Sequence, residues 1–242
     1  MPVGKNNREK TAILLVHGHM GSPRQFRELL PLLPVGADTV CLTLPGHAAD
    51  VAAFRTSDRS QWQRAVMETV ETLRSEYDRL LLVGHSMGGL LLTLEAIRDP
   101  GKILGIVALA LPLGIRLTRR GIGIRLAALH PPREDEDPDV TAARNLCGIS
   151  GLIPRHIPGL LPNTLGLMAL IRETNRRLPG LNVPMLALQG RRDEIVSPAA
   201  VRRACGKNPR ITLEMLEGTS HFRYPPEARA KVAERIAAFL PE

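Results

Sequence analysis

The stretch RLLLVGHSMGGLLLTLEAIR, residues Arg79–Arg98, decides the fold. Its first part, Arg79–His85, is a nearly continuous apolar run, as expected of a strand that is buried on both faces of a parallel sheet. Ser86 follows this strand at once, and the run Met87–Arg98 predicts a helix. The sequence therefore predicts a strand, a sharp turn at Ser86 and a helix.

The turn has the pattern G-x-S-x-G, in which Gly84 and Gly88 flank Ser86. A chain that reverses this tightly holds the serine in a strained backbone conformation, and only small neighbours avoid steric clashes. The turn lifts the hydroxyl out of the sheet, and the helix N-terminus provides partial positive charge for a developing anion. A Gly-rich turn that merely opens a helix is the alternative, but a position directly after a buried strand favours a nucleophilic serine.

Strands and helices alternate along most of the remaining chain. The predicted strands are Thr11–His17, Thr39–Leu44, Arg79–His85, Ile103–Leu111, Val183–Gln189 and Ile211–Leu216. The predicted helices are Pro23–Leu33, Ser60–Tyr77, Met87–Arg98, Pro198–Cys205 and Pro226–Leu240. Apolar strands that alternate with helices predict an α/β protein with a mainly parallel sheet of about six strands and helices on both faces.

The pattern changes between Pro112 and Gly180, where the chain is rich in Gly, Pro and Arg and contains no convincing strand. Helices are plausible at Arg116–Leu129 and Thr164–Arg177, and an acidic run covers Glu134–Asp139. We expect residues 112–180 to form a helical cap inserted over one end of the sheet. Residues 1–111 and 181–242 then form the core domain.

A chain of 242 residues, of which 44% are hydrophobic, suits one domain, or one domain with an insertion. The net charge is +8, but the basic residues are spread along the chain and aromatic residues make up only 3%. This composition argues against nucleic acid as a partner. No apolar run is long enough for a membrane span, and the polar start lacks the core of a signal peptide, so we expect a cytoplasmic protein. Three scattered cysteines predict neither a disulfide framework nor a metal site.

A serine hydroxyl needs a base that takes its proton, and His221 is the best candidate. It lies in the loop after the last predicted strand, and the carboxyl ends of parallel strands meet at one edge of the sheet. His17 and His47 end strands at the same edge and remain alternatives. We expect His85, the neighbour of the serine in the chain, to point away from it.

A carboxylate behind the imidazole would fix its tautomer and stabilise its protonated form. Asp193 follows the fifth predicted strand, at the correct edge, and precedes His221 in the chain. The order serine, acid, histidine accompanies the G-x-S-x-G turn in known enzymes. Glu194 is the adjacent alternative, and both acids could instead pair with neighbouring arginines at the surface.

The negative oxygen of a tetrahedral intermediate needs hydrogen-bond donors. One is the backbone N–H of Met87, directly after Ser86. The second is expected from the Gly-rich loop His17–Ser22, where we favour the N–H of His19 and place Met20 second. Removal of one such donor typically lowers the rate by about a hundredfold or more.

Taken together, these stretches resemble the α/β-hydrolase superfamily, and most of all its small bacterial carboxylesterases and monoacylglycerol lipases. The likeness rests on HGHMGS (His17–Ser22), LPGHA (Leu44–Ala48), VGHSMGG (Val83–Gly89), QGRRDEIV (Gln189–Val196) and GTSHF (Gly218–Phe222). It implies an α/β-hydrolase fold with Ser86 as nucleophile, Asp193 as acid and His221 as base, and with a cap inserted after the fourth predicted strand.

The resemblance implies a serine esterase or lipase-like enzyme that forms an acyl-enzyme on Ser86. Its small-molecule substrates would be short or medium acyl esters or monoacylglycerols, with no metal and no organic cofactor. The same site could serve a thioesterase or a carbon–carbon hydrolase, and a non-catalytic binding protein on this scaffold is a further alternative. The Leu and Ile residues of the cap would suit an acyl chain, or simply bury the cap against the core. Arginines of the cap, among them Arg119 and Arg120, could attract an anionic leaving group, although a solvated face is the simpler interpretation.

Overall fold

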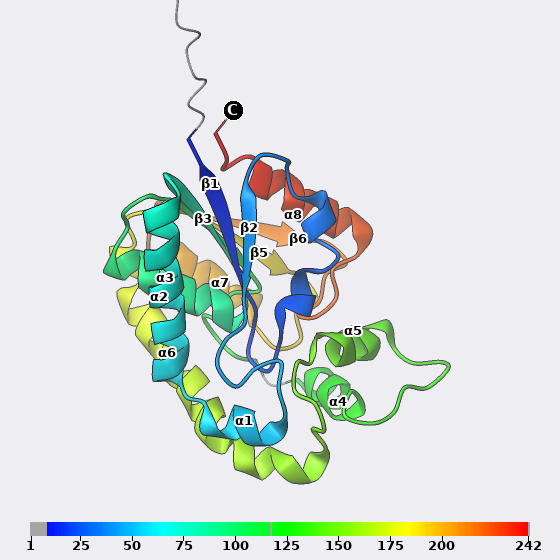
Figure 1. Ribbon diagram of the computed structural model, residues 1–242. Helices are drawn as coiled ribbons and strands as arrows, with labels where there is room; N and C mark the ends of the chain where they lie inside the picture. The colour runs from blue at the N-terminus through cyan, green and yellow to red at the C-terminus, as the bar shows by residue number, and fades with distance from the viewer. Residues whose placement is uncertain (1–8, 117, 242) are drawn as a thin grey trace, which may run out of the picture.

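The computed structural model describes residues 9–116 and 118–241. Its core is an open six-stranded sheet with the strand order β2-β1-β3-β4-β5-β6 (Figure 1). The strands are β1 (Thr11–Val16), β2 (Asp38–Leu42), β3 (Arg79–His85), β4 (Ile103–Leu109), β5 (Met185–Gly190) and β6 (Ile211–Leu216). Every neighbouring pair is parallel, which confirms the predicted fold class. The polar start, residues 1–8, lies outside the described residues, as do Leu117 and Glu242.

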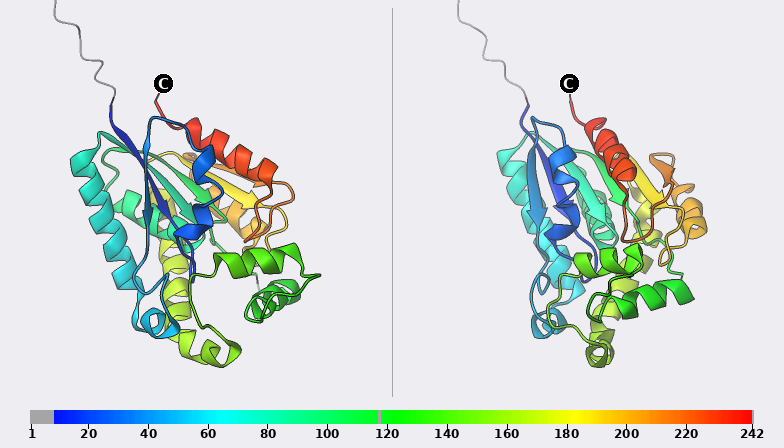
Figure 2. Two further views of the ribbon diagram at one scale, coloured as in Figure 1. Left: turned by 45° about the vertical axis from the view of Figure 1, so that its right-hand side comes forward. Right: turned by 90° about the vertical axis from the view of Figure 1, so that its right-hand side faces the viewer.

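Helices cover both faces of the sheet, as Figure 2 shows. They are α1 (Val51–Thr56), α2 (Arg59–Glu76), α3 (Met87–Arg98), α4 (Arg119–Ala127), α5 (Pro138–Leu146), α6 (Leu161–Arg177), α7 (Pro198–Cys205) and α8 (Pro226–Ala237). Helices α2, α3 and α7 share a hydrophobic cluster on one face, and α8 belongs to the cluster on the other. In the described part of the chain, no helix has the length and apolarity that a bilayer crossing requires.

Side chains of β1 alternate between the two clusters. Leu14 and Val16 pack with α2 and α3, whereas Ile13 and Leu15 face α8. All residues of β1 are buried. Because each fully buried Leu or Ile stabilises the fold by about 1.5–3 kcal/mol, a strand covered on both faces has apolar side chains at nearly every position.

The prediction of one helix over Pro23–Leu33 is wrong. The structure has two short 3-10 helices there, Pro23–Phe26 and Leu30–Leu32. Pro31 has no backbone N–H to donate, and its ring would clash with the preceding turn of an α-helix, so a continuous helix cannot pass through it. Two helices, α1 and α5, are not predicted from the sequence, and both begin at an aspartate that caps the first turn.

The segment between β4 and β5 lies over the carboxyl edge of the sheet (Figures 1 and 2). Backbone N–H groups of Gly148 and Ser150 donate to the carbonyls of Met20 (2.7 Å) and Ala49 (2.8 Å), in the loops after β1 and β2. The Thr118 hydroxyl donates to the carbonyl of Glu194 (2.9 Å), after β5. The segment is therefore tied to three of the loops that follow strands.

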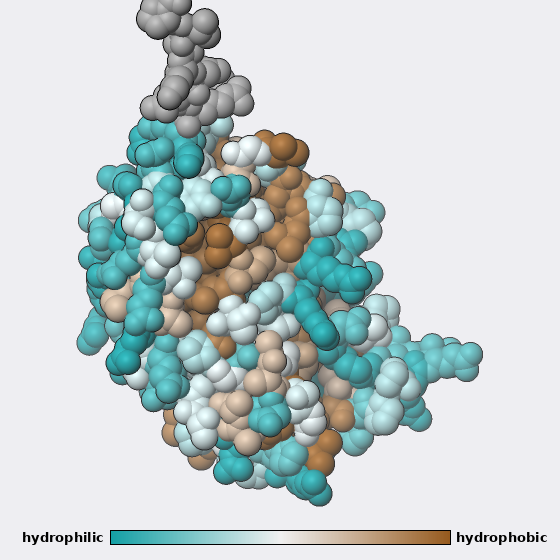
Figure 3. Space-filling model, viewed as in Figure 1, coloured by the Kyte–Doolittle hydropathy of each residue, from teal (hydrophilic) through white to brown (hydrophobic). Residues whose placement is uncertain are grey.

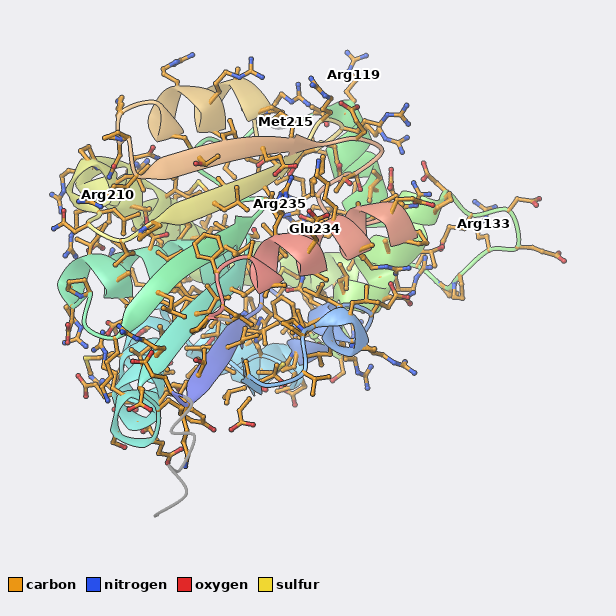
Figure 4. The ribbon with its side chains drawn as sticks, turned by 90° about the horizontal axis from the view of Figure 1, so that it is seen from above. Arg119, Arg133, Arg210, Met215, Glu234 and Arg235 are labelled. Atoms are coloured by element: carbon orange, nitrogen blue, oxygen red, sulfur yellow. The ribbon has the colours of Figure 1, made fainter. Side chains whose placement is uncertain are left out.

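Within this segment α6 packs against α3, and its buried side chains belong to the same cluster as the sheet. Helices α4 and α5 lie apart from that layer, and the loop between them projects from the molecule with a hydrophilic tip (Figure 3). Figure 4 shows Arg133 on this loop, beside the predicted acidic run. The loop between α4 and α5 is therefore a solvent-exposed surface loop.

Candidate active site

The turn between β3 and α3 has the strained geometry expected of a nucleophilic serine. Ser86 has φ 51° and ψ −118°, a conformation that residues with side chains rarely adopt. A Cβ at position 84 would lie 2.5 Å from the backbone nitrogen of Gly89, and one at position 88 would overlap the carbonyl oxygen of Val16. The two glycines of the motif are therefore required by contacts with the backbone.

Gly88→Ala should unfold the turn or displace β1. Because the added methyl group meets a backbone oxygen that cannot rotate away, we expect a loss of roughly 3 kcal/mol or more in the free energy of unfolding. Gly123→Ala is the matched control, since no atom lies within 4 Å of its added Cβ. That variant should be neutral or stabilised by about 0.5–1 kcal/mol in urea unfolding. Equal effects of the two substitutions would contradict the steric explanation.

Backbone donors surround Ser86 on two sides. The carbonyl of Ser86 accepts hydrogen bonds from the N–H groups of Gly89 and Leu90. The N–H of Met87 lies at the N-terminus of α3, where a helix has no backbone acceptor for it. The loop after β1 passes directly beside it, because a Cβ at position 18 would lie 3.1 Å from the Cβ of Ser86. This is the loop that carries His19, so both proposed oxyanion donors belong to segments adjacent to the serine.

Asp193 and His221 form a buried pair. The Nδ1 of His221 donates to Oδ2 of Asp193 at 3.0 Å, and Gln189 donates its side-chain amide to the same oxygen. Backbone N–H groups of Ile195 and Val196 donate to the other oxygen at 2.9 and 2.7 Å. Burial alone would raise the pKa of Asp193, but the charge and hydrogen bond of His221 and these backbone donors hold the pKa below its ordinary value. The carboxylate is therefore ionised and orients the imidazole.

A chain of hydrogen bonds links this histidine loop to the loop after β1. The Nε2 of His85 donates to the carbonyl of His221 at 3.0 Å, and its Nδ1 accepts from the Gln25 amide at 3.4 Å. The Gln25 oxygen in turn accepts from the N–H of Gly18 at 2.7 Å. His85 therefore links the two loops through both of its ring nitrogens. The described residues show no hydrogen bond between the Ser86 hydroxyl and His221; the ring of His85, the residue before Ser86, lies 5.2 Å from that of His221.

Glu194, the alternative acid, has a different place. Its Oε2 accepts from the backbone N–H of His221 at 3.2 Å, while Oε1 is buried without a partner among the described residues. Burial raises the pKa of this carboxyl above its ordinary value. Neither acid is a surface partner of the arginines beside it, since Arg191 pairs with Glu217. The carboxylate that contacts the imidazole of His221 is therefore that of Asp193, whereas Glu194 contacts only its backbone N–H.

Glu194→Gln should change how stability depends on pH. The folded state raises the pKa of Glu194 above 4.5, so the wild type loses stability as the pH rises through that folded-state value. Glutamine can still accept from the His221 N–H, and because it does not ionise, it avoids the free-energy cost of a buried negative charge. We therefore expect the variant to gain stability relative to wild type between pH 4.5 and 8, measured by urea unfolding. A difference that stays constant over this range would contradict the shift, and Glu217→Gln, at an exposed position, serves as control.

The alternative bases are occupied elsewhere. His17 donates from Nδ1 to the carbonyl of Gly18 and accepts the N–H of Leu44 at Nε2. Burial, with the nearby His47, lowers the pKa of His17 to about 3, and burial lowers that of His47 to about 4. The ring of His47 packs against Phe54 at 5.0 Å. Both histidines are therefore neutral and support the loop packing.

Comparisons with known proteins show the family and the fold. A profile described as "Alpha/beta hydrolase family" matches residues 13–235. The human monoglyceride lipase is 26% identical over 94% of this chain and 81% of its own length. A thermostable monoacylglycerol lipase from Bacillus sp. (strain H-257) is 33% identical over 39% of this chain and 38% of its own. The crystal structure of the Paleococcus ferrophilus monoacylglycerol lipase superposes with a TM-score of 0.70 at 20% identity, covering 95% of each chain.

Proposed function

This chain belongs to the α/β-hydrolase family, and we propose that it hydrolyses carboxylic esters through an acyl-enzyme on Ser86. The observation that carries the proposal is the buried Asp193–His221 pair at the edge of the sheet where the strained serine turn opens. An ionised carboxylate behind an imidazole makes the opposite ring nitrogen a base for a nearby hydroxyl. The similarity to monoacylglycerol lipases supports an ester as the substrate.

The reaction would proceed in two halves. Rotation of the Ser86 side chain brings its hydroxyl to Nε2 of His221, which takes the proton while the oxygen attacks the ester carbonyl. The N–H groups of Met87 and His19 would stabilise the resulting oxyanion. Collapse expels the alcohol, protonated by His221, and leaves the acyl group on the serine. Water, deprotonated by the same imidazole, then releases the acid.

We propose that residues 112–180 act as a cap that binds the acyl part of the substrate. This segment and the loop after β1 line most of an open cavity of about 360 Å³ with mostly apolar walls. Phe222, the neighbour of His221, lies in its wall, which connects the cavity to the proposed base. Such a lining suits a short or medium acyl chain, including that of a monoacylglycerol.

Matched 4-nitrophenyl esters and thioesters of two to twelve carbons test this function. We expect ester hydrolysis with an optimum at a medium chain length, and hydrolysis of monoacylglycerols of similar length. Faster cleavage of every thioester than of its ester would assign the site to a thioesterase. Absence of turnover on both series, with the protein folded by circular dichroism, would favour a binding protein.

A further inference from the structure

The cavity under the cap has an unusual electrostatic character. Its walls are formed by apolar side chains of α4, α5 and the 3-10 helix Pro154–Leu160, together with Thr164 of α6 and with His19 and Met20 of the loop after β1. The described lining residues include no aspartate or glutamate. Burial, assisted by the charge of Arg125, lowers the pKa of His19 well below its ordinary value, so this imidazole is neutral. One full charge remains, the guanidinium of Arg125.

Arg125 differs from Arg116 and Arg120, which lie near it in the chain and have partners. Arg120 pairs with Asp137 and Asp139, and Arg116 donates to the carbonyl of Asp193 at 2.8 Å. No ion pair in the described parts of the chain involves Arg125, whose Nη2 lies 3.6 Å from the Sδ of Met20. An arginine stays protonated in proteins. The Arg125 side chain is exposed to solvent and lines the cavity, where its guanidinium is the charged group with which a bound anion could pair.

Arg125 contacts the loop after β1, which passes beside Ser86. Met20, which it contacts, is two residues from Gly18, and Gly18 lies against the side chain of Ser86. His19, the proposed oxyanion donor, stands between them. A substrate whose carbonyl binds at Ser86 and whose chain enters the cavity would therefore extend past the Arg125 head group.

We propose that Arg125 binds a carboxylate carried by the acyl group, so that the preferred substrates are half-esters of dicarboxylic acids. This inference rests on the proposed ester hydrolysis and specifies its substrate class. One guanidinium among apolar side chains matches one negative charge, and its planar fork can donate two hydrogen bonds to a carboxylate. A phosphate dianion would bring a second charge that no other lining residue balances.

The test compares mono-4-nitrophenyl esters of straight-chain dicarboxylic acids, from adipate to sebacate, with neutral 4-nitrophenyl esters of equal carbon number. In wild type we expect kcat/KM to be roughly 10- to 100-fold higher for the charged ester at the best length. Arg125→Gln should abolish this preference, measured as the ratio of kcat/KM for the charged and the neutral ester, mainly through the KM of the charged ester. Arg125→Lys, which keeps the charge but not the fork, should retain part of the preference.

Arg119→Gln is the matched control. Arg119 lies on the same helix, is absent from the cavity walls and points outward in Figure 4, so its loss removes the same charge outside the cavity. This variant should keep the wild-type preference, and thermal unfolding of all variants shows that each is folded. Equal kcat/KM for charged and neutral esters in wild type, or a preference that survives in Arg125→Gln, would overturn the role of Arg125. Failure of wild type to cleave either ester would overturn the proposed function itself.

Discussion

Replacing Ser86 by alanine is expected to lower kcat for 4-nitrophenyl esters by about 10⁴- to 10⁶-fold. The alanine enzyme keeps the oxyanion donors and the cavity but has no oxygen that can form the acyl-enzyme. Ser75→Ala, which removes an exposed hydroxyl from α2, controls for the loss of a serine. Activity within tenfold of wild type in Ser86→Ala would show that another residue is the nucleophile.

The same position also allows a measurement of backbone strain. A side chain at φ 51° costs about 1–3 kcal/mol, whereas glycine at a single site costs about 0.5–1 kcal/mol of extra unfolded-state entropy. Both Ser86→Ala and Ser86→Gly lack the hydroxyl, so their difference isolates the backbone term. We expect the glycine variant to be the more stable by about 1 kcal/mol in urea unfolding. A less stable glycine variant would mean that the turn is not strained.

Asp193→Asn should have the second largest effect, a loss of about 10⁴-fold in kcat. The asparagine oxygen can still accept from Ile195 and Val196, so the loop should keep its shape. The NH2 group of the asparagine cannot accept a hydrogen bond from Nδ1–H of His221. The ring therefore adopts the other tautomer, in which Nε2 is protonated and cannot accept the serine proton. Glu217→Gln, which removes an exposed carboxylate after β6, should leave the rate unchanged. A loss below tenfold in Asp193→Asn would contradict the assigned role.

The same substitution makes a prediction about acid stability. The folded state holds the pKa of Asp193 below 3.8, so this carboxylate contributes stability at neutral pH that is lost as the pH falls below about 4 through the folded-state value. The difference in unfolding free energy between wild type and Asp193→Asn should therefore shrink with acidification. Urea titrations at pH 7 and pH 3 measure this directly.

The elements nearest the site were the most predictable from sequence. The strand Arg79–His85 and the helix Met87–Arg98 have the predicted bounds, because one stretch of chain contains a buried strand, two obligatory glycines and an apolar helix. The choice of Asp193 and His221 as acid and base followed from the edge at which parallel strands end. Their direct contact in the structure agrees with that expectation.

Other features depend on contacts between remote segments and left weaker signals. Helix α5 has a recognisable start, with Asp137 as cap and Pro138 in the first position, but it lies in a Gly- and Pro-rich stretch. The series of hydrogen bonds that runs from Gly18 through Gln25 and His85 to the loop of His221 corresponds to no sequence pattern. Its members are remote in the chain, and only the folded sheet brings them together. Arg125 was indistinguishable from the solvated arginines around it, since only the cavity sets it apart.

A fluorophosphonate probe tests the catalytic serine most directly. We expect the folded wild-type protein to become labelled at a single residue, identified as Ser86 by peptide mass mapping, and the labelling to be lost in His221→Ala. A label on any other residue, or a folded wild-type protein that the probe does not modify, would contradict a nucleophilic Ser86 activated by His221.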